Sequence, residues 1–198
     1  MPLSATPWGY SVSLGEGETI QPLLTLEGFH DLTGHKFVSD GRIQSAILAT
    51  TARFRSHCGW HVAGSLRCVA TFDGGPRTLW LPSAHVTSLD EVTVLGEDVT
   101  ERCEWSELGQ LRLPPTPDRL RAVTVAFTSG FAEVPEDLAA LVAHRVVHDV
   151  ALPFGIQQET AGSVSVSYAQ SATSGQGVVH LTASDRAALS AYRLTEAR

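Results

Sequence analysis

Two short stretches contain side chains that can bind a metal ion or act as a nucleophile. The first is "HRVVH", in which His144 and His148 lie one helical turn apart, the spacing that zinc proteases use. The catalytic form of that motif needs a glutamate general base after the first histidine, and Arg145 occupies that position. A structural metal would need a third ligand, for which Asp137 and Asp149 are candidates. We favour the alternative of two partly exposed histidines beside an apolar helix face.

The second stretch, "SHCGWH", covers residues 56 to 61. We expect a helix to end at Gly59 and a strand to begin at Trp60 and His61. Neighbouring residues of a strand point to opposite faces, so His61 would not converge with His57 on one ion. Cys58 falls on the apolar arc of the preceding helix. The stretch is therefore interpreted as a helix end with a core cysteine.

Composition argues against several other classes of protein. The chain has 198 residues, 43% of them hydrophobic, and its three cysteines form no CxxC pair, which argues against a disulfide framework or zinc ribbon and favours a reducing, intracellular setting. We expect neither a secretion signal nor a membrane span. A net charge of -7 with only 14 Lys and Arg argues against tight binding of nucleic acid. Nucleotide-binding loops and nucleophile elbows are not found in the sequence. We expect no catalysis and no cofactor.

Periodicity predicts two main helices with a β segment between them. A helix from about residue 39 to 59 places Ile43, Ile47, Thr50 and Phe54 on one arc. Alternation predicts strands at 66–72 and 122–130, and β-branched residues predict another at 85–95, before Gly96. The turn at 73–76 is followed by "RTLWLP", which returns the chain. Further on, "SVSVSY" predicts a short strand, and a terminal helix is expected to begin at Ser184 as N-cap.

The predicted fold class is α+β, with a helical bundle core, an antiparallel β insertion between the two main helices, and a C-terminal helix or arm. We divide the chain into a flexible N-terminal arm (1–22), a helical core with C-terminal arm (23–59 and 131–198) and a β-sheet insertion (60–130).

The second main helix, from Pro135 to Val150, is apolar over more than half of its circumference. A helix of that kind is normally buried on more than one side. Arg145 and Asp149 lie one turn apart and can pair. We expect this helix to pack both against its own chain and against a neighbouring subunit.

The order of six segments resembles the head-to-tail connector, or adaptor, proteins of long-tailed bacteriophages of the siphophage type. These segments are "RIQSAILATTARFRSHCGWHV", "LWLPSAHVTSLDEVTVLG", "CEWSELGQLRL", "VTVAFTSGFAEVPEDLAALV", "ALPFGIQQETAGSVSVSY" and "LTASDRAALSAYRL". The resemblance implies a structural virion protein, made in the host cytoplasm and located at the head-tail junction. There it would form an oligomeric ring, commonly a dodecamer, that binds the portal and extends the DNA channel.

The resemblance also implies partners and contact residues. The partners would be the portal protein, the next connector, stopper or tail protein, and sister copies, while DNA passes without specific binding and no membrane is involved. The residues assigned to the subunit interface are Leu138, Leu141, Val142, Arg145, Val146 and Asp149. Portal-facing candidates are Leu189, Tyr192, Arg193 and Leu194. The loop facing the channel or the next ring contains Asp73, Gly74, Gly75 and Arg77.

Three alternatives stay open from the residues alone. Another virion joint, such as a stopper or tail terminator, would have a smaller helical share. A metal-dependent hydrolase would use His144 and His148. A carbohydrate-binding β module would expose its tryptophans on the sheet, whereas we place Trp60 and Trp80 in the core.

Overall fold

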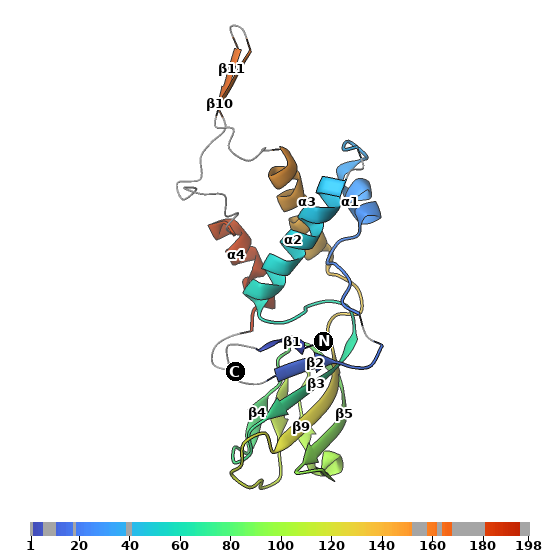
Figure 1. Ribbon diagram of the computed structural model, residues 1–198, viewed down its shortest axis with the longest axis vertical. Helices are drawn as coiled ribbons and strands as arrows, with labels where there is room; N and C mark the ends of the chain where they lie inside the picture. Colours follow the sequence, from blue (N-terminus) through green and yellow to red (C-terminus); the bar gives the residue numbers. More distant parts are fainter. Residues whose placement is uncertain are drawn as a thin grey trace.

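Helices gather in one half of the long molecule and most of the β-strands in the other (Figure 1). The computed structural model describes residues 2–5, 11–17, 19–38, 41–151, 158–161, 164–167 and 181–194. The predicted α+β class is confirmed. The division of the chain into an arm, a helical core and an insertion stays a prediction.

The helical half, called the helical lobe below, consists of four helices in the described residues. They are α1 (Leu26–Thr33), α2 (Gly41–Cys58), α3 (Glu136–Ala151) and α4 (Ala183–Leu189), the last continued by a 3-10 turn, Ser190–Tyr192. Within the described part of the chain, none of the helices has the length and apolar character needed to cross a membrane.

The apolar period expected for α2 is present. Ile43, Ile47, Thr50, Phe54 and Cys58 are all buried, and the helix ends at Gly59, whose φ is 85°. Cys58 is therefore a core residue, as the sequence predicts.

The N-terminus of α4 differs from the prediction. Thr182, and not Ser184, is the N-cap. Its hydroxyl accepts a hydrogen bond from the Asp185 backbone N–H, and the Asp185 carboxylate accepts one from the Thr182 N–H (3.0 and 2.9 Å). This reciprocal capping box satisfies two free helix donors, which explains why the helix begins where it does.

The main sheet has the strand order β1-β2-β3-β9-β5-β6, with every pair antiparallel. Its strands are β1 (Pro2–Ala5), β2 (Ser11–Leu14), β3 (Leu66–Phe72), β9 (Val123–Ser129), β5 (Val86–Val94) and β6 (Glu97–Asp98). The alternation predicted for β3 is confirmed: Leu66, Cys68, Ala70 and Phe72 are buried. Strands β1 and β2 lie within the segment expected to be a flexible arm, and the pairing of β2 with β1 and β3 gives that segment hydrogen-bond partners.

A second sheet has the order β4-β8-β7, formed by β4 (Thr78–Trp80), β8 (Gln110–Arg112) and β7 (Glu104–Trp105). The segment "RTLWLP" therefore does not return along β3; it pairs with β8, about thirty residues later in the chain. A further hairpin joins β10 (Gln158–Ala161), in a segment expected to be a loop, to β11 (Val164–Ser167).

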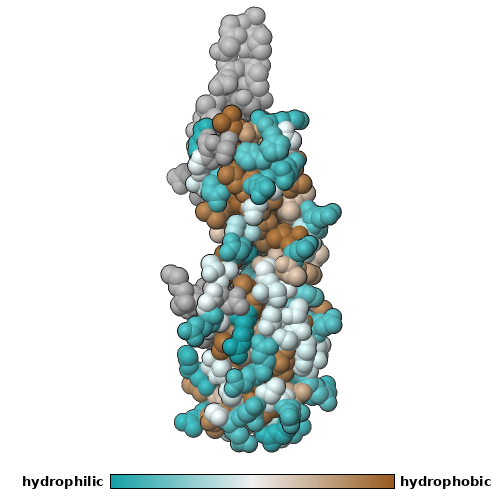
Figure 2. All heavy atoms as spheres, turned by 90° about the vertical axis from the view of Figure 1, so that its right-hand side faces the viewer, coloured by the Kyte–Doolittle hydropathy of each residue, from teal (hydrophilic) through white to brown (hydrophobic). Residues whose placement is uncertain are grey.

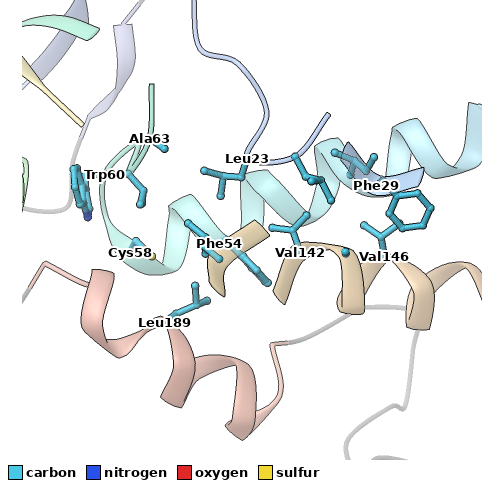
Figure 3. Packing of buried hydrophobic residues seen from close by; sticks show 14 of the residues in the cluster. Leu23, Phe29, Phe54, Cys58, Trp60, Ala63, Val142, Val146 and Leu189 are labelled. Atoms are coloured by element: carbon cyan, nitrogen blue, oxygen red, sulfur yellow. The ribbon is translucent and has the colours of Figure 1, made fainter. Parts of the chain in front are cut away.

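Each half of the molecule has its own hydrophobic core. The sheet half, called the sheet lobe below, is built on a cluster that includes Leu66, Phe72, Val92, Leu111, Val125 and Phe127. The helical cluster includes Leu23, Phe29, Phe54, Cys58, Val142, Val146 and Leu189 (Figure 3).

The link from α2 to β3 is irregular, although a strand was expected from Trp60 and His61. Arg55 explains the difference, because its guanidinium donates to the carbonyls of His61, Gln21 and Ala63 at 2.7, 2.8 and 3.3 Å. Because those carbonyls all accept from one guanidinium, they cannot form the hydrogen bonds of a β-strand pair. Burial lowers the pKa of Arg55 to about 10, which leaves the guanidinium charged at neutral pH.

His61 and Gly130 meet at this link. The His61 Nε2 lies 2.9 Å from the Ser129 carbonyl and 3.1 Å from the Gly64 carbonyl, so Nε2 carries the proton and donates. A Cβ on Gly130, whose φ is 104°, would overlap both His61 Nε2 and the Gly64 carbonyl oxygen.

We predict that Gly130→Ala lowers the free energy of unfolding by about 3 kcal/mol, because it combines a disfavoured φ with a backbone overlap. Urea denaturation followed by circular dichroism measures the change. Gly34→Ala is the matched control: φ is 62°, but no atom lies within 4 Å of the added Cβ, so only about 1 kcal/mol is expected. Equal losses of unfolding free energy in the two variants would show that the overlap with His61 and Gly64 costs nothing.

Candidate assembly interface

The residues expected at a subunit interface on α3 lie mostly inside their own chain. Leu138, Val142 and Val146 are at most 1% exposed, and Arg145 is 7% exposed. In Figure 3, Val142 and Val146 point from α3 toward α2. Helices α1 and α2 pack against α3 and cover this face. The expectation that these four residues meet a neighbouring subunit therefore differs from the structure, because they have almost no surface to offer.

Leu141 and Asp149 are the other two residues of that set, and both keep part of their surface. Leu141 is half-buried at the edge of the helical cluster, together with Ala139, Val147 and Val150. Whether Leu141 and Asp149 contact a sister subunit stays a prediction. Exposed apolar side chains of this lobe include Leu32, Val38 and Leu48. Figure 2 shows apolar surface between polar residues on one face of the lobe.

A buried ionic cluster joins three helices of this lobe. Arg145 lies 3.1 Å from Asp149 and 3.7 Å from Asp185, while Arg53 donates to Asp149 at 3.1 Å. The side chains of Arg145, Asp149 and Asp185 are only 7 to 13% exposed. The Arg145 Nε contact with Asp149 is an ion pair without hydrogen-bond geometry.

The predicted pairing of Arg145 with Asp149 is confirmed, whereas Arg53 and Asp185 were missed. No local sequence pattern indicates that Arg53 belongs to the cluster, because its contact with Asp149 joins positions far apart in the chain. Asp185 could have been found as the third residue after the capping threonine Thr182. The cluster links α2, α3 and the first turn of α4.

The C-terminal segment is anchored in the helical lobe. Leu189 and Leu194 are buried in the helical cluster, and the Leu194 N–H donates to the Cys58 carbonyl at 2.8 Å. Their apolar surface therefore belongs to their own chain and not to a portal-facing surface. Of the four candidates, Arg193 is exposed and Tyr192 is partly exposed.

Tyr192 is held from two sides. Its hydroxyl donates to the Asp137 carboxylate at 2.7 Å, and its carbonyl accepts from Trp60 Nε1 at 2.6 Å. Desolvation, together with the Asp137 carboxylate, raises the pKa of Tyr192 to about 12. The hydroxyl therefore stays protonated and keeps α3 joined to the end of the chain.

The loop from Asp73 to Arg77 lies at the end of the sheet lobe away from the helices, where β3 ends. Asp73, Gly75 and Arg77 are exposed, whereas Gly74 is buried against the Pro117 carbonyl. The assignment of this loop to the channel or the next ring stays a prediction.

The geometry of the stretches tested for chemistry does not favour catalysis. His144 and His148 are both exposed, and the described residues contain no group of three His, Cys, Asp or Glu that could hold a metal ion. Burial raises the pKa of the Cys58 thiol to about 12, so it is a poor nucleophile at neutral pH. Trp60 is buried, as predicted, which argues against a sugar-binding face there.

The comparisons with known proteins bear on the fold. No protein-family model matches the sequence, and no curated protein matches it significantly. Among solved structures, a chain of "Neck of native GTA particle computed with C12 symmetry" matches with a TM-score of 0.57 at 17% identity. A chain of "Neck of empty GTA particle computed with C6 symmetry" matches with a TM-score of 0.60 at 16% identity.

Each match covers 93% of this chain and 96% of the other. GTA stands for gene transfer agent, a phage-like particle. This chain shares its fold with neck components of such particles, which agrees with the resemblance to connector proteins seen in the sequence.

We predict that Arg145→Ala lowers the free energy of unfolding by about 3 kcal/mol, because Asp149 and Asp185 then lose a buried counter-charge. Chemical denaturation measures the loss. The matched control is Arg112→Ala, which breaks an exposed pair with Glu104 and should cost less than about 1 kcal/mol. Similar losses in the two variants would show that burial of the cluster contributes nothing.

We predict that the protein loses stability in mild acid partly through His61. Desolvation lowers the pKa of His61 below its ordinary value of 6.5. The unfolded chain therefore takes up the proton at a higher pH than the folded chain does. The stability that neutral His61 contributes is complete above pH 6.5 and declines as the pH falls below it. His61→Gln keeps an N–H donor without titrating, so its melting temperature should fall less between pH 7 and pH 5. If the melting temperatures of both proteins fall equally between pH 7 and pH 5, His61 does not contribute to the loss of stability in acid.

Proposed function

We propose that this chain is a structural virion protein, a head-to-tail connector (adaptor) of a phage-like particle. It forms a ring under the portal, joins the capsid to the tail and extends the DNA channel. The observation that carries the proposal is the fold shared with neck components over nearly the whole of both chains. The site geometry agrees with a role without catalysis: in the described part of the chain the exposed histidine pair has no third metal ligand, and the pKa of the Cys58 thiol is raised by burial.

The charge of the chain suits a protein beside a DNA path. A net charge of -7 gives each copy a repulsive interaction with phosphates, and a ring multiplies that charge. DNA then passes without being held. Tight, specific binding of DNA would instead need clusters of Lys and Arg, which total 14 in the whole chain.

A ring of twelve copies is the proposed assembly. The two neck structures were computed with C12 and C6 symmetry, and a twelvefold ring satisfies both because sixfold rotation is a subset of twelvefold rotation. In a cyclic ring each subunit presents two different surfaces to its neighbours. We assign one of them to the helical lobe, with Leu48, Leu141 and the small part of Asp149 that stays accessible, 13% of its side chain.

The ends of the subunit then receive different partners. We assign the helical lobe to the portal side, with Arg193 and Tyr192 as the contact residues of the C-terminal segment. Leu189 and Leu194 anchor that segment in its own core. The opposite end, which includes Asp73 to Arg77, faces the next connector, stopper or tail protein.

The test is to purify particles from cells that encode a tagged copy of the chain, and to image their necks by electron microscopy. We expect one ring of this chain between head and tail, and DNA-filled heads without tails when the gene is deleted. Tailed particles from the deletion strain, or particles that lack the chain, would refute the proposal.

A pair of variants tests the ring surface. Leu48 is 50% exposed on α2, and Leu48→Glu should exclude the chain from particles because it places a charge in an apolar contact. Leu108, which is 58% exposed in the sheet lobe, provides the matched control as Leu108→Glu. Both variants should melt like the unmodified chain, which separates assembly from folding.

A further inference from the structure

The helical lobe and the sheet lobe share little packing. In the described part of the chain, every extensive contact between regular elements lies within one lobe. Irregular segments join the lobes (Figure 1), and they include residues 19–25, 59–65 and 130–135. Lobes with a small shared interface move relative to one another unless their connection holds them. The orientation of the sheet lobe therefore depends on the contacts within these segments.

Val62, in the middle of this connection, has an unfavourable backbone conformation. Its φ is 68°, and the His61 carbonyl before it accepts a hydrogen bond from the Ala63 N–H after it at 2.9 Å. A three-residue turn with a positive φ at its centre is the rare and strained form of the γ-turn. Gly59 and Gly64 also have positive φ values, which glycine adopts without cost. Valine, with its branched Cβ, is a true outlier in that region.

Arg55 holds this strained turn from outside. Its guanidinium donates to the carbonyls of His61 and Ala63, which flank Val62, and to the Gln21 carbonyl in the segment before α1. A strained backbone persists only where the surrounding contacts over-determine it. A glycine at position 62 would form the same turn without strain. With valine there, the turn depends on the contacts that Arg55 supplies.

The strain at Val62 is coupled to the direction of the chain between the lobes. The Val62 side chain is buried in the helical cluster, while its carbonyl accepts from the Phe131 N–H at 2.9 Å, in the segment that follows β9. The next buried residue of the sheet cluster is Leu66, four positions further on. Rotation of the Val62 φ to a negative value re-aims the chain that leads to Leu66. Relief of the strain therefore changes how the sheet lobe is oriented.

We propose that the connection is a two-state joint and that Arg55 is its latch. While the guanidinium holds the flanking carbonyls, Val62 stays in the strained turn and the lobes keep the orientation described above. When those hydrogen bonds open, Val62 relaxes to a negative φ and the sheet lobe swings relative to the helical lobe. The inference does not depend on the proposed function. In the proposed ring, the joint would let the sheet lobes adjust after the helical lobes are seated.

The distance between the lobes tests the joint. Spin labels are attached to the free, full-length chain through Leu48→Cys and Leu108→Cys, with Cys103→Ser because the Cys103 thiol, unlike the other two, is not buried. Pulsed electron spin resonance then measures the distance distribution. We expect one narrow distance when Arg55 is present. Arg55→Met keeps the bulk of the side chain without its donors, and roughly a tenth or more of the molecules should then show a second distance.

A second substitution separates release of strain from general loosening. Val62→Gly accepts the turn without strain, so adding it to Arg55→Met should lower the second population about threefold or more. Arg119→Met, which removes an exposed arginine of the sheet lobe, is the matched control and should keep one distance.

Two outcomes would overturn the inference. One is a single, unchanged distance in Arg55→Met, and the other is a second distance that Val62→Gly leaves undiminished. If Arg55→Met does not melt cooperatively, Arg55→Lys takes its place under the same criteria, because a single ammonium group lacks the planar fork of donors that serves the three carbonyls.

Discussion

Covering the apolar surface of α3 is the constraint on which the rest of the helical lobe depends. A 16-residue helix that is apolar on most sides must be enclosed, and the structure encloses it with α1 and α2 of the same chain. That arrangement also brings Arg145 and Asp149 inside, where unpaired charges would be costly. Arg53 from α2 and Asp185 from α4 supply the partners. The ionic cluster is thus a consequence of how the apolar surface is covered.

In the link between the lobes, as in the helical lobe, charged and polar side chains supply the partners that buried polar groups need. The chain crosses from α2 to β3 without regular secondary structure, and side chains donate hydrogen bonds to its backbone carbonyls instead. Arg55 donates hydrogen bonds to three backbone carbonyls, and His61 donates to two more. Gly130 leaves room for the imidazole. Two of these contacts are long-range: Arg55 binds the Gln21 carbonyl before α1, and His61 binds the Ser129 carbonyl at the end of β9. They tie the link to both lobes.

Local periodicity predicted most of the regular elements but not their partners. The arc of α2 and the alternation of β3 are properties of short windows, and the structure confirms them. The alternation expected for β9 fails at Ala126, which is buried together with Val125 and Phe127. The pairing of β4 with β8 and of β2 with β3 depends on distant segments, so no local pattern indicated it. The linker at Trp60 was misassigned because its hydrogen bonds come from Arg55 and not from a neighbouring strand.

The interface residues on α3 illustrate a different limit. Apolar residues around a helix predict that it is covered, but the pattern is the same whether the cover comes from the same chain or from another. Val142 and Val146 are buried in the core of their own chain, whereas Leu141 keeps part of its surface.

A subunit whose two cores are closed within one chain must assemble through its periphery. Peripheral contacts are small, and each alone binds weakly once the loss of rotational and translational freedom is counted. A ring multiplies such contacts, and a template that already holds the subunits side by side raises their effective concentration. Weak lateral contacts on the helical lobe would then be sufficient at a portal and insufficient in free solution. In the ring proposed above, the chain would stay dispersed after synthesis and assemble only at the portal.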